Sequence, residues 1–381
     1  MARTASSAAR PRRKGSAGGG GDLTVFFATN RNPVGDPVRP DGFGTALNGD
    51  GAELRFGAAR FAGLAASWSH DVPTGRHALG VFAEDPGAGV LGSTELSARL
   101  QRLLGGQGEA ATHDLLLYVH GFQTGFAEAL ALTARIAVNL EAIRRAMPEE
   151  ERPRPLVPTV FTWPSDGVLG TRAYWSDVKD AERSGEALRR AVNLLVDVLA
   201  EVAAARPLGA APRLVLMVQS LGHAVLASAL SALDFPGGID VVLSTGADIE
   251  ADAFGREGGL RRLPELVPRT VVYHCERDGA LQLSQKLRSN PVRFRFAGFR
   301  LGQRGPLRDP GVATVEAVDV GAVVIGTGDD THHFYGRRNR TVQADMLRVL
   351  AGIPPSLIAG RSPAGAGRFV LGHGGYVSPA A

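Results

Sequence analysis

The stretch Arg213-Leu-Val-Leu-Met-Val-Gln-Ser220-Leu-Gly222-His223 decides the fold of this 381-residue chain. Its first six residues form a short apolar run typical of a buried parallel strand, and Ala224 to Leu233 has the small-residue pattern of a helix. A strand that turns sharply through a serine into a helix is the nucleophile elbow of serine hydrolases. Such a turn exposes the Ser220 hydroxyl at the carboxyl end of the sheet, beside free backbone N–H groups that can stabilise an oxyanion.

The pattern around Ser220 is incomplete. Small residues are expected two positions before and after the serine, because the strand and the helix pass close together there. Gly222 fits the downstream position, whereas Val218 occupies the upstream one. The competing interpretation is that Ser220 only caps a helix N-terminus. Motifs elsewhere in the chain are needed to distinguish this cap from a nucleophile elbow.

The composition is that of a globular protein, with 44% hydrophobic and 21% charged residues. The formal net charge is +4, and much of it comes from five basic residues among the first fourteen, so we expect no nucleic-acid partner. The single cysteine, Cys275, excludes an intramolecular disulfide and a cysteine-based zinc site. No run approaches the ~18 apolar residues of a membrane span, and no apolar signal segment follows the N-terminal arginines, which favours a cytoplasmic protein without a transmembrane segment.

The organisation along the chain predicts a disordered basic arm at 1–21, a single α/β domain at 22–352 and an irregular tail at 353–381. Within the domain, 22–110 reads as a β-rich extension and 111–352 as the catalytic core. Strands are expected in the extension at Leu23–Thr29, Glu53–Phe56 and Ala78–Phe82, with a turn at Asn30–Pro33.

In the core, strands and helices alternate, which predicts a mostly parallel sheet with helices on both faces. The expected strands are Asp114–Val119, Leu156–Thr162, Arg213–Val218, Ile239–Leu243, Arg269–His274 and Val315–Val320. The expected helices are Ala127–Ala146, Asp177–Ala205, Ala224–Leu233 and Thr341–Leu350.

A serine nucleophile needs a base, and the base needs an orienting acid. Asp278 lies just past the second strand after the Ser220 strand, where the acid of an α/β hydrolase belongs. Asp248 follows the intervening strand and is the alternative; it could equally cap a helix or line the pocket.

The base is expected in the loop that carries His332 and His333, after the last core strand. We choose His332 and keep His333 as the alternative. The competing interpretations are a surface pair or a metal site with the preceding Asp329 and Asp330, but a zinc site needs three or four ligands in defined geometry, so we predict neither metal nor cofactor. His223 lies too close to Ser220 in sequence to act as its base and is read as a helix-start or pocket residue.

An oxyanion hole needs two N–H donors. Leu221, directly after the serine, supplies one. His120-Gly121-Phe122 follows the first strong core strand, and Gly121 lets the backbone turn close to Ser220, so the Phe122 N–H is the expected second donor. An ordinary strand-ending turn is the alternative for this tripeptide.

These motifs together resemble one family, the α/β hydrolases of unknown function called DUF900. Its members typically show V-H-G-[FY]-N, F-x-W-P-S and A-H-S-M-G-N. The matching segments here are Phe26-Phe-Ala-Thr-Asn-Arg31, Leu117-Tyr-Val-His-Gly-Phe122, Phe161-Thr-Trp-Pro-Ser-Asp-Gly167, Gln219-Ser-Leu-Gly-His223, Asp278-Gly-Ala-Leu281 and His332-His-Phe-Tyr335. The last match points to His332 as the base.

The chain departs from that pattern at Val218, Gln219, Leu221 and His223, where the family usually has a smaller residue, histidine, methionine and asparagine. The resemblance implies serine-hydrolase chemistry without naming an ester. We expect an ester or thioester of a small, uncharged acyl substrate. An inactive hydrolase fold that serves as a binding or scaffold module, and an acyltransferase, are the alternatives. The sequence indicates neither an acyl-chain length nor an oligomeric state.

Overall fold

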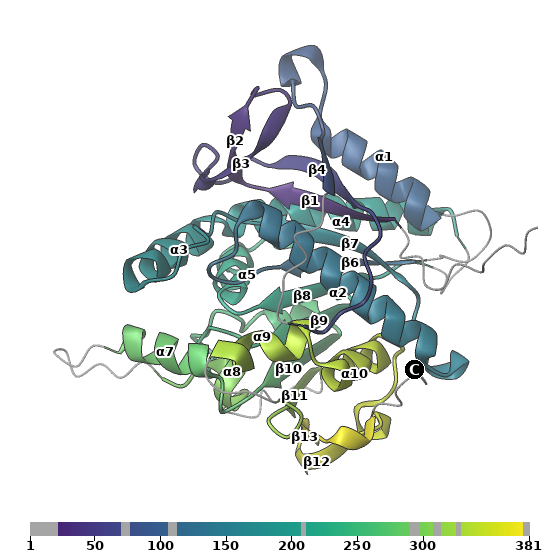
Figure 1. Ribbon diagram of the computed structural model, residues 1–381, viewed down its shortest axis with the longest axis vertical. Coiled ribbons are helices and arrows are strands. Elements are labelled where there is room, and N and C mark those ends of the chain that lie inside the picture. Colours follow the sequence, from purple (N-terminus) through teal and green to yellow (C-terminus); the bar gives the residue numbers. More distant parts are fainter. Residues whose placement is uncertain are drawn as a thin grey trace, which may run out of the picture.

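The computed structural model describes residues 22–69, 77–105, 113–206, 211–289, 298–307, 314–324 and 329–375. The predicted arm at 1–21 lies outside this part of the chain. The described residues form one eleven-stranded sheet, flanked by helices, and a separate two-stranded sheet (Figure 1).

The strands are β1 (Leu23–Thr29), β2 (Arg31–Gly35), β3 (Pro40–Leu47), β4 (Arg55–Phe61), β5 (His77–Val81), β6 (Asp114–Val119), β7 (Leu156–Thr162), β8 (Leu214–Gln219), β9 (Val241–Thr245), β10 (Arg269–His274), β11 (Val315–Asp319), β12 (Arg361–Gly365) and β13 (Arg368–Leu371). The helices are α1 (Gly92–Gly105), α2 (Phe126–Ala146), α3 (Thr171–Arg183), α4 (Gly185–Ala204), α5 (Gly222–Ser231), α6 (Leu263–Leu266), α7 (Gly279–Arg288), α8 (Leu301–Arg304), α9 (Asp329–Arg337) and α10 (Arg340–Leu350).

The centre of the large sheet is parallel, which confirms the predicted α/β class. The strand order is β12-β13-β11-β10-β9-β8-β6-β7-β1-β4-β5, and every pairing from β13 to β1 is parallel. The chain order reverses between β6 and β8, because β7 pairs on one side of β6 and β8 on the other. In open α/β sheets the crevice beyond the carboxyl ends at such a switch point is where ligands bind.

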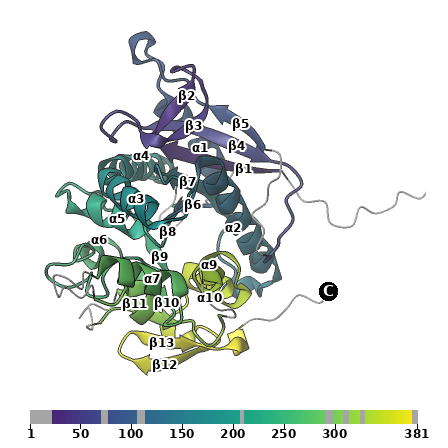
Figure 2. The ribbon, with the colours of Figure 1, turned by 60° about the vertical axis from the view of Figure 1, so that its left-hand side comes forward.

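Helices cover both faces of the sheet, and Figure 2 shows α3, α4 and α5 on one side and α2, α9 and α10 on the other. Each face has its own buried apolar cluster: the first lies under α1, α3, α4 and α5, and the second under α2, α9 and α10. Side chains of β8 alternate between these clusters, with Leu216 and Val218 in the first and Val215 and Met217 in the second. Its near-continuous apolar run is therefore the signature of a strand buried on both faces.

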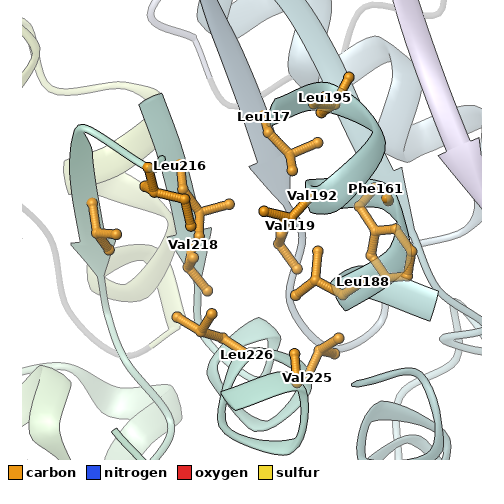
Figure 3. Packing of buried hydrophobic residues seen from close by; sticks show 14 of the residues in the cluster. Leu117, Val119, Phe161, Leu188, Val192, Leu195, Leu216, Val218, Val225 and Leu226 are labelled. Carbon is orange, nitrogen blue, oxygen red and sulfur yellow. The ribbon is translucent and has the colours of Figure 1, made fainter. Parts of the chain in front are cut away.

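Val218 does not distort the elbow. Its side chain is fully buried and belongs to the same apolar cluster as Leu226 of α5 and Val119 of β6, and Figure 3 shows it within this packing. A branched side chain is accommodated at this position because it points into the core under α5.

The N-terminal region is β-rich, as predicted, and β4 and β5 extend the large sheet in antiparallel fashion beyond β1. The predicted turn at Asn30–Pro33 is wrong, because these residues open the irregular β2–β3 hairpin. Helix α1 was not predicted. Leu96, Leu100 and Leu104 lie on one face of it and are buried, which is the four-residue spacing of an amphipathic helix.

The single long helix predicted at Asp177–Ala205 is in fact two helices, α3 and α4, which meet at Ser184. The break coincides with a close crossing over α5. A Cβ on Gly185 would lie 2.3 Å from Ser228 Oγ, so only glycine lets the backbone approach this near.

The described part of the tail, 353–375, is not irregular as predicted. Strands β12 and β13 form a hairpin, and β13 pairs with β11 at the edge of the large sheet. Buried Arg361 anchors the hairpin through Asp345 of α10 at 2.7 Å and Glu316 of β11 at 2.5 Å. The sheet thus extends beyond residue 352. The Gly- and Pro-rich sequence of the tail does not show a strand pattern, and the hairpin is held by ion pairs to residues distant in the sequence.

Candidate functional site

Ser220 occupies a sharp turn between β8 and α5. Its φ of 50° lies in the left-handed region, which a non-glycine residue rarely adopts. The Ser220 N–H donates to the Thr245 carbonyl at 3.1 Å, and its own carbonyl accepts from the N–H groups of His223 at 3.1 Å and Asp248 at 3.2 Å. Such strain persists only where surrounding contacts fix the backbone, and it is concentrated at functional sites.

Two glycines let the chain segments around Ser220 meet. A Cβ on Gly222 would lie 2.7 Å from the His120 carbonyl oxygen, and a Cβ on Gly121 would lie 2.6 Å from Ser220 Cβ. The expected small residue is therefore needed at Gly222, and Gly121 lets the backbone after β6 come directly against the serine.

His223 holds the turn from inside and does not line the cavity described below. Its Nδ1 lies 2.9 Å from the Ser220 carbonyl oxygen and its Nε2 lies 2.7 Å from Ser244 Oγ. A carbonyl only accepts, so Nδ1 carries the hydrogen and Nε2 accepts from the serine hydroxyl. Burial lowers the pKa of His223 to about 4, which keeps the ring neutral and suited to this arrangement.

His120 is also a buried, neutral ring. Its Nε2 accepts from the Trp163 N–H at 3.2 Å, its Nδ1 lies 2.9 Å from the Gly121 carbonyl oxygen, and burial holds its pKa well below the usual value. The ring stacks on Trp163, whose indole N–H donates to the His120 carbonyl at 2.9 Å. His120 thus links the ends of β6 and β7 and is not exposed to a substrate.

The loop after Gly121 is held by a buried carboxylate. Gln123 has a φ of 57°, and its N–H donates to Asp177 of α3 at 3.3 Å. Asp177 also accepts from the Asp166 N–H at 3.1 Å and from the Ser165 hydroxyl. The Ser165-Asp166 segment that sequence analysis placed in a family motif therefore supports the backbone around Phe122.

A buried arginine supports the same loop from the other side. Arg31 Nη2 donates to the Thr124 carbonyl at 2.8 Å, Nη1 donates to the Ser165 carbonyl at 3.1 Å, and Nε donates to Thr162 Oγ1 at 3.0 Å. Burial lowers the pKa of Arg31 to about 9, so the guanidinium remains charged at neutral pH.

The structure brings Asp278 and His332 together. Asp278 follows β10 and caps α7, where its Oδ1 accepts from the Leu281 N–H at 3.0 Å. Its Oδ2 lies 2.8 Å from His332 Nδ1 and accepts from the Tyr335 hydroxyl at 2.6 Å. All three side chains are buried.

The electrostatic environment of His332 favours its charged form. Burial lowers the pKa of His332, but the Asp278 carboxylate raises it more, and the net shift is upward from 6.5. Burial, with Asp278 beside it, raises the pKa of Tyr335 well above the usual value, so this hydroxyl stays protonated and donates to the carboxylate. Asp278 therefore fixes His332 with the hydrogen on Nδ1, and Nε2 is the nitrogen suited to accept a proton.

The segment that carries His332 is helix α9, not the predicted loop. Helical geometry places residues three apart on one face, so His332 and Tyr335 both reach Asp278. The side chain of the alternative base, His333, and those of Asp329 and Asp330 lie outside the described part of the structure.

Asp248, the alternative acid, is bound elsewhere. Its Oδ1 accepts from Arg300 Nε at 2.8 Å and from Ser284 Oγ at 2.5 Å, and its Oδ2 accepts from the Tyr174 hydroxyl at 2.9 Å. Burial raises the pKa of Asp248, but Arg300 and Arg288 lower it more, so the carboxylate stays charged. Asp248 thus lines the pocket, one of the roles its sequence position allowed.

These groups surround one cavity of about 200 Å³ beyond the carboxyl ends of β6 and β8. Ser220 and His332 both line it. The other lining residues are Gly121, Phe122, Gln123, Leu169, Gly170, Thr171, Tyr174, Gln219, Asp248, Ala280, Leu281, Leu283, Ser284, Leu287 and Arg337.

Comparison with known protein families supports the α/β-hydrolase fold. Residues 98–348 match the family described as alpha/beta hydrolase of unknown function (DUF900). The chain is a DUF900 α/β hydrolase. No curated protein matches the sequence.

Sequence reasoning missed three polar residues of this DUF900 site. Gln219 Oε1 accepts from the Tyr118 hydroxyl and from Arg337 Nε, the latter at 2.7 Å, and Arg337 Nη2 lies 3.3 Å from the Tyr118 hydroxyl oxygen. Gln219 stands where histidine is usual in the family, and its carbonyl oxygen suits the two donors. The alternation of side chains along β6 and β8 was the available signal. It places Tyr118 and Gln219 together on the face of the sheet opposite Val119 and Val218.

Within the described ranges of this DUF900 hydrolase, no helix is both long and apolar enough to cross a membrane. Over the same ranges, no three His, Cys, Asp or Glu side chains gather into a possible metal site.

Proposed function

We propose that this α/β hydrolase is a serine hydrolase that cleaves an ester or thioester through Ser220, His332 and Asp278. Ser220 Oγ attacks the acyl carbonyl while His332 Nε2 accepts the hydroxyl proton. The protonated His332, oriented by Asp278, then donates that proton to the leaving alcohol or thiol. Water attacks the resulting acyl-Ser220, again with His332 as base, which releases the carboxylic acid and restores the serine.

The observation that carries the proposal is the position of the Asp278–His332 pair. The pair contributes His332 to the wall of the same small cavity as Ser220, although 112 residues separate the histidine from the serine in the sequence. A buried serine at a φ of 50° on the edge of that cavity is the geometry of an activated nucleophile.

The backbone around Ser220 supports an oxyanion hole at Phe122 and Leu221. Leu221 begins the turn into α5, and Phe122 follows Gly121, which lies directly against the serine. Among the described residues, neither the Phe122 nor the Leu221 N–H donates a hydrogen bond. Two such donors beside the nucleophile are what a tetrahedral oxyanion requires.

Labelling with a fluorophosphonate probe tests this function, because the probe reacts with a serine whose base and oxyanion hole are in place. We expect the purified protein to be labelled, and Ser220→Ala and His332→Ala to lose labelling. Ser231→Ala, an exposed serine on the same helix α5, and His373→Ala, an exposed histidine, are the matched controls and should label like the natural chain. A folded protein that resists the probe would favour the alternative of a binding or scaffold module.

The same probe does not separate a hydrolase from an acyltransferase. Product analysis does, because a hydrolase releases free acid from a p-nitrophenyl ester in water alone, whereas a transferase forms product only when an acceptor is supplied.

A further inference from the structure

The cavity beside Ser220 has an apolar half and a polar half. Ala280, Leu281, Leu283 and Leu287, all from α7, line one side, together with Leu169 from the segment before α3. Leu287 also packs against the apolar cluster beneath α3, α4 and α5, so this half belongs to that face of the sheet. An aliphatic group in the cavity would therefore lie between α3 and α7. Tyr174, Ser284 and Asp248 line the cavity there too, but their polar atoms hydrogen-bond one another.

The opposite side of the cavity is formed by hydrogen-bonding groups. Gln219 and Arg337 line it, and both contact Tyr118, whose ring belongs to the apolar cluster on the other face of the sheet. Ser220, which Gln219 directly precedes, lines the same cavity as Leu281. A bound ester is thus offered apolar surface on one side of its carbonyl and polar groups on the other.

The apolar half continues onto the protein surface. Leu169 and Leu283 line the cavity and are 69% and 53% exposed. Val168, next to Leu169, and Trp175 on α3 are also exposed large apolar side chains. Arg288 of α7 lies over the Trp175 ring at 5.9 Å, which brings α3 and α7 together at this mouth. Single exposed apolar residues are common, but two that also line a cavity, Leu169 and Leu283, indicate a binding surface.

The enclosed volume sets how much of a substrate the cavity holds. About 200 Å³ is below the range of about 300–1,000 Å³ that is typical of pockets for drug-sized ligands. The cavity therefore accommodates an ester group and a few carbons, and any longer chain must continue over Leu169 and Leu283.

We propose that the substrate is an ester of an aliphatic acid of medium chain length, whose acyl chain leaves the cavity between α3 and α7 over Leu169 and Leu283. The polar side, at Gln219 and Arg337, receives the alcohol portion. This inference rests on the proposed serine-hydrolase function and assigns it a substrate class.

A series of p-nitrophenyl esters from acetate to dodecanoate tests the proposal. Each added methylene that leaves water on binding contributes about twofold to fourfold to kcat/KM. We expect kcat/KM to rise over several methylenes and to level off once the chain extends past Leu283. A kcat/KM that is highest for acetate and falls with every added carbon would overturn the proposal.

Surface variants locate the chain. The double variant Leu169→Ser/Leu283→Ser should lower the ratio of decanoate to acetate kcat/KM by about tenfold, since it removes two apolar contacts that only a long chain reaches. Leu233→Ser alters a leucine that is 91% exposed and lies outside the cavity lining, and it should leave the ratio unchanged. An equal ratio in the double variant and the natural chain would contradict the route over these leucines.

Binding of 2-alkanones to Ser220→Ala separates failure of this inference from failure of the proposed function. These neutral ketones resemble the ester and need no catalysis, so calorimetry reports chain binding alone. Affinity that increases from 2-butanone to 2-decanone, and does so less in Leu169→Ser/Leu283→Ser, supports the apolar route even for a chain that fluorophosphonate does not label. Affinity independent of chain length overturns the route even if Ser220 is labelled.

Discussion

Asp248 and Asp278 occupy comparable places but have different partners. Each lies buried just beyond the carboxyl end of a strand, Asp248 after β9 and Asp278 after the neighbouring β10. Asp248 contacts Arg300, a permanent cation, whereas Asp278 contacts His332, whose charge changes near neutral pH. A carboxylate beside a guanidinium is fixed in an ion pair, and a carboxylate beside an imidazole can orient a base. The partner, not the location, therefore distinguishes the two acids.

The surroundings reinforce this difference. The Asp248 cluster ties together three segments through Tyr174 of α3, Ser284 of α7 and Arg300. The Asp278 cluster joins the start of α7 to α9, through the Leu281 N–H and His332, and presents His332 to the cavity. We infer that the first cluster stabilises the wall of the cavity and that the second carries out proton transfer.

Asp278→Asn should have the largest effect on activity. An amide oriented toward Nδ1 no longer stabilises a protonated His332 and favours the wrong tautomer, so we expect kcat to fall by about 10³- to 10⁴-fold. The rate of p-nitrophenyl ester hydrolysis measures this. Asp248→Asn is the matched comparison and should retain kcat to within about tenfold of the natural chain. The comparison fails if the two variants lose activity equally.

Asp248→Asn should instead lower the free energy of unfolding. Removing one charge of a buried ion pair usually leaves its partner charge uncompensated, which destabilises the fold. Arg300 keeps a second ion pair, with Glu250 at 2.8 Å, so we expect a loss of about 3 kcal/mol, the low end for buried pairs. Urea unfolding measures it. Asp234→Asn, which removes an exposed partner of Arg189, should cost less than about 1 kcal/mol. An equal cost for both variants would show that the Asp248 cluster is not a structural anchor.

The pH dependence of activity should report the titration of His332 in the Asp278–His332 pair. Since the pKa of His332 is raised from 6.5, kcat/KM should fall about tenfold per pH unit below a midpoint above 6.5. A profile from pH 5 to 9 measures this, and a midpoint below 6.5 would contradict it. The effect on stability runs the other way. The raised folded-state pKa means that protonated His332 stabilises the fold below pH 6.5, and this contribution is lost as pH rises through the folded pKa.

Tyr335→Phe should have the smallest effect. It removes one hydrogen bond to Asp278 without touching His332, so we expect kcat/KM to fall by about fivefold to tenfold. Because the carboxylate loses a donor and attracts the imidazolium more strongly, the midpoint of the pH profile should rise. A loss of rate with an unmoved midpoint would mean that the Tyr335 hydrogen bond does not affect the pKa of His332.

Local patterns in the sequence predicted the parts of the fold and site that depend on neighbouring residues. The apolar run of β8 and the turn at Ser220 are encoded within eleven residues, and the sheet class follows from the alternation of such units. The helix at His332 was missed because its polar sequence, Asp329-Asp-Thr-His-His, lacks an apolar stripe. The i, i+3 spacing of His332 and Tyr335 was the available signal.

Contacts between distant segments could not be predicted from the sequence. The hairpin at β12–β13 depends on Arg361 meeting Glu316 and Asp345, and no local spacing encodes such a meeting. Sequence position favoured Asp278 as the acid and left Asp248 as the alternative, but it did not predict the partner of either carboxylate. The place of Arg300 beside Asp248 and of His332 beside Asp278 arises from the fold.

Arg31 has a consequence for the order in which the site can form. It lies outside residues 98–348, the part that matches the family, yet it holds Thr124 and Ser165 across separations of 93 and 134 residues. Contacts so distant in sequence carry a large loop-closure entropy, so we expect them to form late in folding. The β2–β3 hairpin, which carries Arg31, is therefore synthesised before β7 and can form these contacts only after β7 has been made. A chain shortened to residues 98–348 would retain every residue of the proposed reaction. It would lack the hydrogen bonds of Arg31 to Thr124 and Ser165, which hold the loop beside Ser220.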